Sequence, residues 1–175
     1  IAHYEIVKQL KESFKVEKVI IVPVGDSYTW KHGLVPFLHR YRMLNRMFQG
    51  EKDILISDLE NKQDFDGTYW LLNQLKKTYQ DIYFCLGTDH LNTMQLWKNH
   101  EKLLLEFGFI VISRRDYPAD YTIFDRFQTP YYKFYFDSDI SSSRIRREFH
   151  RFKNDLRKEV LDYILEHNLY QGENV

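Results

Sequence analysis

The sequence predicts an α/β fold in which a parallel β-sheet is covered by helices on both faces. Strand-like runs alternate with helical segments four times along the 175 residues, and each run is apolar throughout rather than alternating in polarity. Continuously apolar strands are typical of parallel sheets buried on both faces, whose strands are joined by helical crossovers. The pattern therefore indicates a doubly wound fold, which binds ligands at the carboxyl ends of its strands.

The elements are expected in the following order. Strands are predicted at four apolar runs, residues 18–24, 54–57, 82–87 and 109–113. Apolar side chains at helical spacing predict helices before and between them, at residues 6–14, 36–48, 68–79 and 91–105. Residues 117–136 are crowded with Tyr and Phe, which we expect to pack under a long loop or, for one or two rings, to stack on a base. Two polar-faced helices at residues 141–152 and 155–167 close the chain. Because no linker or repeat interrupts residues 1–175, we expect one domain.

The composition excludes several classes of partner. The 25 Lys and Arg residues balance the 25 Asp and Glu residues, so the chain has no net basic charge that would predict a nucleic-acid partner. No apolar stretch approaches the roughly 20 residues that cross a bilayer, so no membrane partner is expected. The single cysteine, Cys85, cannot form an internal disulfide, which favours a reducing, cytoplasmic location. Cys85 lies in the apolar run IYFCL and is expected to be a small core residue.

The segment ISSSRIRR (140–147) has the strongest local potential for chemistry. Three serines stand where a helix is expected to begin, and three arginines lie in its first turns. A helix N-terminus offers unpaired N–H groups and a positive dipole end to phosphate, and arginine adds charge-assisted, fork-shaped hydrogen bonds. A serine cap followed by solvated arginines explains the same residues. Taken alone, the pattern slightly favours that plainer interpretation.

This segment resembles the ISSTxIR motif of the nicotinamide and nicotinate mononucleotide adenylyltransferases, which belong to the nucleotidyltransferase superfamily and have a Rossmann-like fold. Further segments match the same family in order along the chain. LGTD (86–89) followed by Trp97 is similar to its GxD…W segment, and FIVISRR (109–115) to a strand that ends in a functional arginine. Residues 22–44 are similar to a loop with a phosphate-directed lysine, and YILEHNLY (163–170) to the closing helix. The resemblance therefore covers nearly the whole chain.

The start of the chain, Ile1-Ala2-His3, resembles the end of another family motif. The family has a Gly- and Phe-rich loop after its first strand, which leads into H/T-x-G-H at the start of the first helix. His3 matches the final histidine, and Ala2 stands where the family has glycine. The resemblance implies that the first strand and the phosphate loop are missing from this chain. Residues 1–175 would then be a single, N-terminally incomplete nucleotidyltransferase domain.

The resemblance also implies an activity, the transfer of AMP from ATP to nicotinate or nicotinamide mononucleotide, with Mg²⁺ held by the ATP phosphates and water. It assigns catalytic roles to His3, Lys31 and Arg146. It assigns ATP binding to His3, Gly87, Asp89, Ser142, Ser143 and Arg146. It assigns mononucleotide binding to Tyr69, Trp97 and Arg114. The sequence has no clustered carboxylates or metal-ligand spacing, so no dedicated metal site is expected.

Several alternatives stay open. Asp89 would also suit a helix cap, Trp97 a core position and Arg114 a surface ion pair. Many bacterial members of the family have Ser-Tyr-Thr where this chain has Thr-Tyr-Trp (68–70), which leaves the choice between acid and amide open. A related adenylyltransferase with another phosphate acceptor, such as phosphopantetheine, and a non-catalytic nucleotide-binding module are the competing functions. The sequence leaves homo-oligomer formation undecided.

Overall fold

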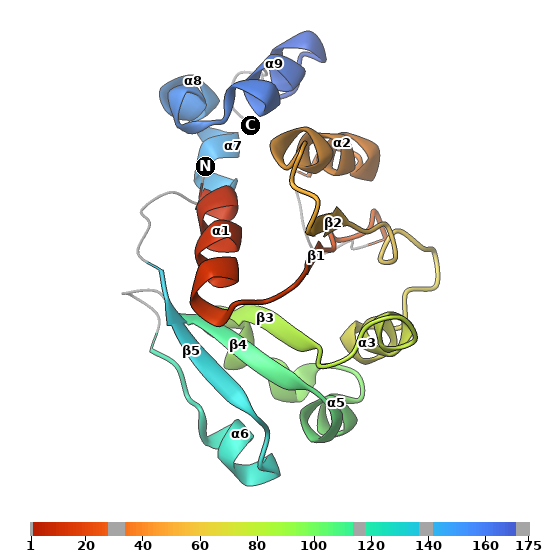
Figure 1. Cartoon of the computed structure of the whole chain (residues 1–175). Helices are drawn as coiled ribbons and strands as arrows, with labels where there is room; N and C mark the ends of the chain where they lie inside the picture. The colour runs from red at the N-terminus through yellow and green to blue at the C-terminus, as the bar shows by residue number, and fades with distance from the viewer. Residues whose placement is uncertain (1, 28–33, 114–117, 137–141, 171–175) are drawn as a thin grey trace. The chain divides into compact units, whose positions relative to one another are not determined.

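The computed structural model describes residues 2–27, 34–113, 118–136 and 142–170, without the side chains of residues 2 and 142–144. The chain divides into two compact units, which we describe one at a time (Figure 1). Unit 1 comprises residues 1–65 and 138–175, and unit 2 comprises residues 66–137. None of the helices in the described ranges is long and apolar enough to cross a bilayer.

Unit 1 combines a short parallel sheet with helices from both ends of the chain. Its elements are α1 (Ala2–Phe14), β1 (Val19–Ile21), α2 (Phe37–Met47), β2 (Ile54–Ile56), α7 (Ser142–Arg147), α8 (Phe149–Phe152), η2 (Lys153–Asp155) and α9 (Lys158–Glu166). Strands β1 and β2 pair in parallel, with Val19 opposite Ile54. Val7 of α1 and Phe48 pack with Ile54 in one buried cluster, and a second buried cluster joins α2 to α8 and α9.

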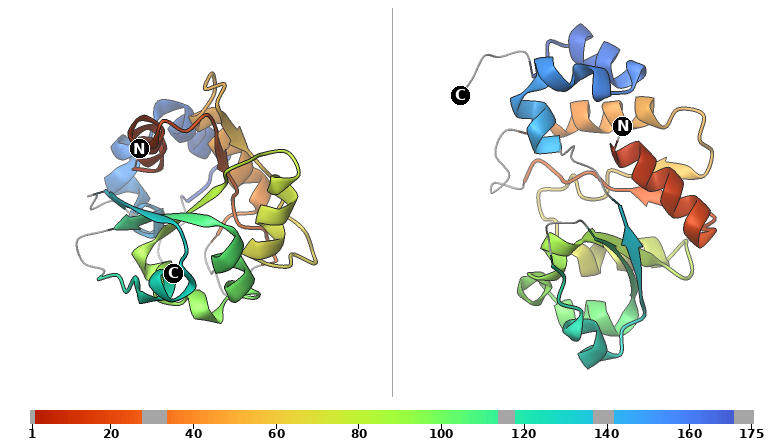
Figure 2. Two further views of the ribbon diagram at one scale, coloured as in Figure 1. Left: turned by 60° about the horizontal axis from the view of Figure 1, so that its bottom comes forward. Right: turned by 90° about the vertical axis from the view of Figure 1, so that its left-hand side faces the viewer.

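Unit 2 is built on a three-stranded parallel sheet with the order β3-β4-β5. Its elements are α3 (Thr68–Lys76), β3 (Tyr83–Gly87), α4 (Thr88–Leu91), η1 (Met94–Leu96), α5 (His100–Glu106), β4 (Gly108–Ser113), α6 (Thr122–Phe127) and β5 (Tyr131–Tyr135). Helices α5 and α6 lie on one face of this sheet (Figures 1 and 2), where Leu103 and Phe124 are buried against Phe109 and Val111. The main apolar core of the unit is therefore on this face.

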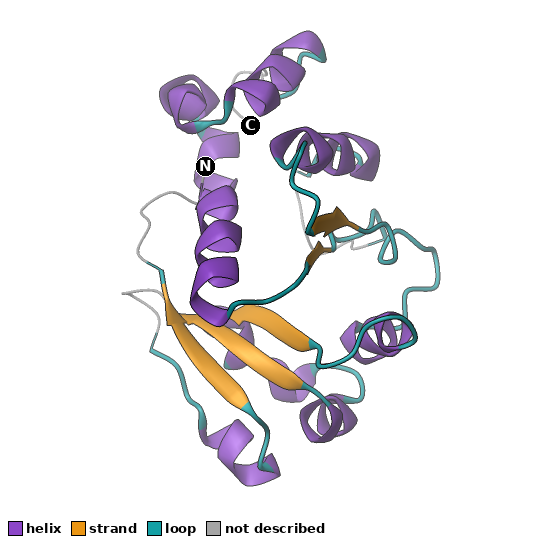
Figure 3. Ribbon diagram, in the orientation of Figure 1, coloured by secondary structure: helices purple, strands orange, loops and turns teal. Residues whose placement is uncertain are grey.

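The predicted α/β class and the parallel strands are confirmed (Figure 3). All four expected strands are present, divided among the described residues between the two sheets. The helices expected at residues 91–105 and 141–152 are each interrupted, so the observed helices are shorter than predicted. Asn99, in the left-handed conformation with φ 58°, separates α5 from η1, and Glu148 separates α7 from α8.

Residues 118–136 form more regular structure than the sequence suggested. The expectation of a long loop is wrong here, because these residues include helix α6 and strand β5. Tyr131 of β5 pairs opposite Phe109 and stacks on Phe124, with ring centroids 4.8 Å apart. The polar Lys133 in the middle of this strand breaks the continuous apolar run that revealed the other strands. Packing of the aromatic rings, rather than strand hydropathy, therefore stabilises β5.

Cys85 is exposed, which corrects the expectation of a core residue. Successive side chains of a strand point to opposite faces of the sheet. Since Phe84 and Leu86 pack into the core of unit 2, Cys85 between them points to the opposite face. Neighbouring protein atoms nevertheless desolvate the sulfur and raise the pKa of the thiol to about 11, so it stays protonated at neutral pH.

Candidate active site

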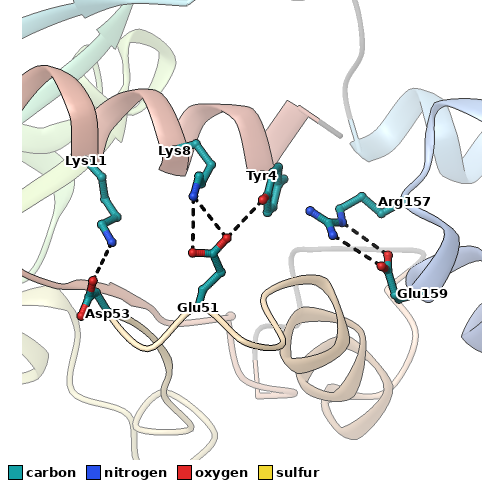
Figure 4. Close-up of polar contacts among 7 residues, drawn as sticks. All are labelled: Tyr4, Lys8, Lys11, Glu51, Asp53, Arg157 and Glu159. Atoms are coloured by element: carbon teal, nitrogen blue, oxygen red, sulfur yellow. Dashed lines mark hydrogen bonds and ion pairs between the residues drawn. The ribbon is translucent and has the colours of Figure 1, made fainter.

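His3 lies exposed in the first turn of α1, and the rest of this helix is fixed within unit 1. Val7 is buried against Phe48 and Ile54. On a neighbouring face, Lys8 donates to both carboxylate oxygens of Glu51 at 3.2 and 3.4 Å (Figure 4). This hydrogen bond raises the pKa of the lysine and lowers that of the carboxyl group. Helix α1 is thus attached to the segment that leads into β2 by apolar packing and by charge.

Hydrogen bonds and an ion pair also hold together the two ends of the segment between β1 and α2. The carboxylate of Asp26 accepts hydrogen bonds from the backbone N–H of Phe37 at 2.8 and 2.9 Å and pairs with the Arg40 guanidinium at 2.8 Å. Arg40 also donates to the carbonyl oxygens of Val24 and of Val35, the latter at 2.9 Å. The two ends of the segment that contains the predicted phosphate lysine are therefore joined through one arginine. Lys31 itself lies outside the described residues.

The serine–arginine segment begins a helix, as predicted. Helix α7 starts at Ser142, and Arg146 in its second turn is partly buried whereas Arg147 is exposed. The guanidinium groups of Arg146 and Arg40 both act on the Tyr170 hydroxyl: burial raises the pKa of this phenol, and the two cations oppose that rise. Both arginines, one from α7 and one from α2, are thus close enough to Tyr170 to lower the pKa of its phenol. The side chains of Ser142 and Ser143 are outside the description.

In unit 2, Gly87 and Asp89 lie at the carboxyl end of β3, where α4 begins. A Cβ atom at position 87 would collide with a carboxylate oxygen of Asp89, so a larger residue here would shift the end of this side chain. The Asp89 side chain is half exposed and accessible to a ligand. The adjacent Thr88 hydroxyl is buried without a hydrogen-bond partner in the described structure, and unpaired polar groups of this kind occur at functional sites. The arrangement suits a hydroxyl-bearing ligand at the strand end.

Trp97 lies close to the same strand end. Its ring meets Phe84 edge-on at 6.0 Å and His90 at 6.3 Å between centroids. The His90 Nε2 atom is in turn 3.8 Å from a carboxylate oxygen of Asp89. His90 thus connects the predicted ATP residue Asp89 to the predicted mononucleotide residue Trp97, a position that its sequence context did not reveal.

Tyr69 faces a different neighbour. Its hydroxyl donates to Glu106 of α5 at 2.8 Å, and its ring packs edge-on against Phe107. The hydrogen bond to Glu106 raises the pKa of the phenol. This hydroxyl is therefore engaged within unit 2, and a contact with the mononucleotide stays a prediction. Arg114, the third residue assigned to the mononucleotide, follows the end of β4 and lies outside the described residues.

Two further features of the described residues bear on ligands. An open hollow of about 790 Å³ in unit 2 is lined by residues of α4, η1, α6 and the segment before α6, none of them assigned to a ligand above. No group of three or more His, Cys, Asp or Glu side chains able to hold a metal ion occurs in the described part of the chain.

Comparison with known proteins identifies the class. A sequence model of the cytidylyltransferase-like family matches residues 1–148, which span parts of both units. The chain therefore belongs to the cytidylyltransferase-like family. This confirms the predicted resemblance to nucleotidyltransferases.

More particular relatives share nearly the whole chain. It is 41% identical over 171 residues to a probable nicotinate-nucleotide adenylyltransferase of Acholeplasma laidlawii, covering 98% of this chain and 91% of that protein. A protein of the same name from Aliarcobacter butzleri is 30% identical over 176 residues, with the same coverage. Two structures of Plasmodium falciparum nicotinic acid mononucleotide adenylyltransferase, complexed with APC and with NaAD, superimpose with TM-scores of 0.77 and 0.75. Their sequences are 27% and 26% identical to this chain. Each match covers 97% of this chain and 90% of the other chain.

Proposed function

We propose that this chain transfers the adenylyl group of ATP to nicotinate mononucleotide, giving the dinucleotide and pyrophosphate. The observation that carries the proposal is the 41% identity, over 98% of the chain, to a probable nicotinate-nucleotide adenylyltransferase. The solved relative complexed with NaAD supports nicotinate rather than nicotinamide as the pyridine. One family model spans residues 1–148, which supports a single nucleotidyltransferase domain.

The reaction needs no nucleophile from the protein. A 5′-phosphate oxygen of the mononucleotide forms a bond to the α-phosphorus of ATP, the bond from that phosphorus to the bridging oxygen breaks, and the electron pair leaves with pyrophosphate. Catalysis then consists of aligning the two phosphates and stabilising the charge that moves to the leaving group. Hydrogen-bond donors and cations are the side chains suited to both tasks.

We assign these tasks to residues of unit 1. His3, exposed at the start of α1, would donate to an ATP phosphate oxygen, and Arg146 with Lys31 would neutralise the triphosphate. Ser142 and Ser143, at the start of α7, would add donors. Mg²⁺, when bound to the ATP phosphates, supplies further neutralisation of charge.

The residues at the carboxyl end of β3 would recognise the nucleosides. The half-exposed Asp89 carboxylate can accept hydrogen bonds from ribose hydroxyls of ATP. Trp97 offers a flat face to the pyridine ring, and Arg114 would pair with an anionic group of the mononucleotide.

An acceptor panel tests the proposal. The full-length protein would be incubated with ATP and Mg²⁺ together with nicotinate mononucleotide, nicotinamide mononucleotide or phosphopantetheine, and products separated by chromatography. We expect the dinucleotide and pyrophosphate in equal amounts, with nicotinate mononucleotide the better pyridine substrate. Product from phosphopantetheine alone would identify a different adenylyltransferase, and binding of ATP without any product would identify a non-catalytic module.

A further inference from the structure

The side chain next to His3 is held by three separate segments of unit 1. The ring of Tyr4 stacks on Phe48, with centroids 5.5 Å apart and planes 24° from parallel. Its hydroxyl donates to Glu51 at 3.2 Å (Figure 4). The guanidinium carbon of Arg157 lies 4.1 Å from the ring centroid. Tyr4 thus contacts the end of α2, the segment before β2 and the beginning of α9.

These contacts hold the first turn of α1, which is the part of the helix that its own backbone hydrogen bonds fix least. The first four N–H groups of a helix have no partner within it, and helix ends open more readily than helix centres. Lys8 and Lys11 attach later turns of α1 to Glu51 and Asp53. Among the residues of α1 labelled in Figure 4, Tyr4 lies in the first turn, and its hydroxyl bonds to Glu51 there.

Fixing Tyr4 also fixes its neighbour. Adjacent Cα atoms are about 3.8 Å apart, so holding Tyr4 also restrains the backbone of His3 and narrows the positions that its imidazole can reach. Arg157 extends this restraint to the C-terminal helices, since it precedes α9 and is itself held by Glu159 at 3.4 Å. Tyr4 therefore joins the helix that presents His3 to the helices that follow the serine–arginine segment.

We propose that Tyr4 is a positioning residue for His3, holding the first turn of α1 so that the imidazole can donate to a phosphate of ATP. This inference rests on the proposed adenylyl transfer. Tyr4 does not touch the reacting atoms; it acts through the backbone it anchors, and Arg157 supports it from α9.

A double-mutant cycle separates positioning from plain stability. Tyr4→Leu keeps apolar packing but removes the ring and the hydroxyl, and should lower kcat about 10- to 100-fold, the range of a misplaced catalytic group. The KM for ATP should change less than about threefold. In a His3→Ala background, Tyr4→Leu should cause no further loss of kcat, because the group it positions is gone. Tyr4→Phe, which keeps the ring contacts, should restore kcat to within about threefold of wild type.

Lys11→Met is the matched control, since it removes a partly exposed ion pair further along the same helix and should leave kcat within about twofold of wild type. Equal losses from Tyr4→Leu with and without His3, or wild-type kcat in Tyr4→Leu, overturn the inference. If Tyr4→Leu does not fold, Arg157→Gln is measured in its place. A loss of kcat of at least about threefold that vanishes in the His3→Ala background supports the positioning role of Tyr4. A wild-type kcat in Arg157→Gln overturns that role. Failure of the acceptor panel overturns the proposed function as well, whereas a normal panel with equal losses refutes Tyr4 alone.

Discussion

Replacing Arg40 by Met should destabilise unit 1 through the segment between β1 and α2. The Arg40 side chain is 11% exposed, and it donates to the carbonyl oxygens of Val24 and Val35 while pairing with Asp26. Methionine retains most of the apolar stem but leaves both carbonyl oxygens without this donor.

The magnitude follows from these three contacts. Each lost hydrogen bond to a partly buried carbonyl oxygen costs about 1 kcal/mol, and more where the acceptor is left unpaired. The ion pair adds about 0.5–1 kcal/mol, because the Asp26 side chain is 55% exposed and solvent screens it. We therefore expect the free energy of unfolding to fall by about 2–4 kcal/mol. Because the contacts join both ends of the segment that contains Lys31, the KM for ATP should also rise.

Urea unfolding measures this loss from the shift in midpoint at an unchanged slope. Arg42→Met is the control, since Arg42 is exposed on the same helix and should change the free energy of unfolding by less than about 0.5 kcal/mol. If Arg40→Met costs no more than Arg42→Met, the arginine does not join the two ends of the segment, and our reading of these contacts is refuted.

Three further predictions concern the candidate site and the helix that presents it. Arg146→Ala should weaken ATP binding, measured by calorimetry, by about 1.5–3 kcal/mol. Arg147 is exposed, so Arg147→Ala should hardly change ATP binding. Equal small losses in the two variants would mean a diffuse basic surface. The pKa of Glu51 is lowered in the folded state, chiefly by its lysine partner, so its stabilising effect is complete above the ordinary carboxyl pKa of 4.5 and is lost as the pH falls through the folded value. Glu51→Gln should therefore flatten the decline of thermal stability in acid, and an unchanged pH profile would exclude this contribution. Asp89→Ala, which removes the carboxylate, should weaken ATP binding about tenfold, and unaltered affinity would remove Asp89 from the site.

Hydropathy predicted the parts of the fold that depend on local pattern. The continuously apolar runs around Ile54 and Val111 became parallel strands, in which Ile54 and Val111 themselves are buried. Hydropathy did not predict strand β5, because Lys133 interrupts its run of aromatic residues.

The candidate site was predicted through motif order, which locates residues such as Gly87 and Arg146 but not the contacts that hold them. The attachment of Tyr4 to Arg157 joins opposite ends of the chain, and the two ends show no local pattern that would pair them. The signal for Arg40 was present within the family-like segment at residues 22–44, although its three partners depend on how that segment closes. Long-range pairing is therefore what the sequence left undetermined.

The central claim is that the first turn of α1 supplies a donor for adenylyl transfer, and the turnover of His3→Ala tests it most directly. The rate of pyrophosphate release from ATP and nicotinate mononucleotide, at saturating concentrations of both, would be compared in the wild-type and variant full-length proteins. We predict that kcat falls by about two to three orders of magnitude, the usual loss when one charge-stabilising donor is removed. A kcat for His3→Ala close to that of the wild type would contradict the account and make His3 a structural residue.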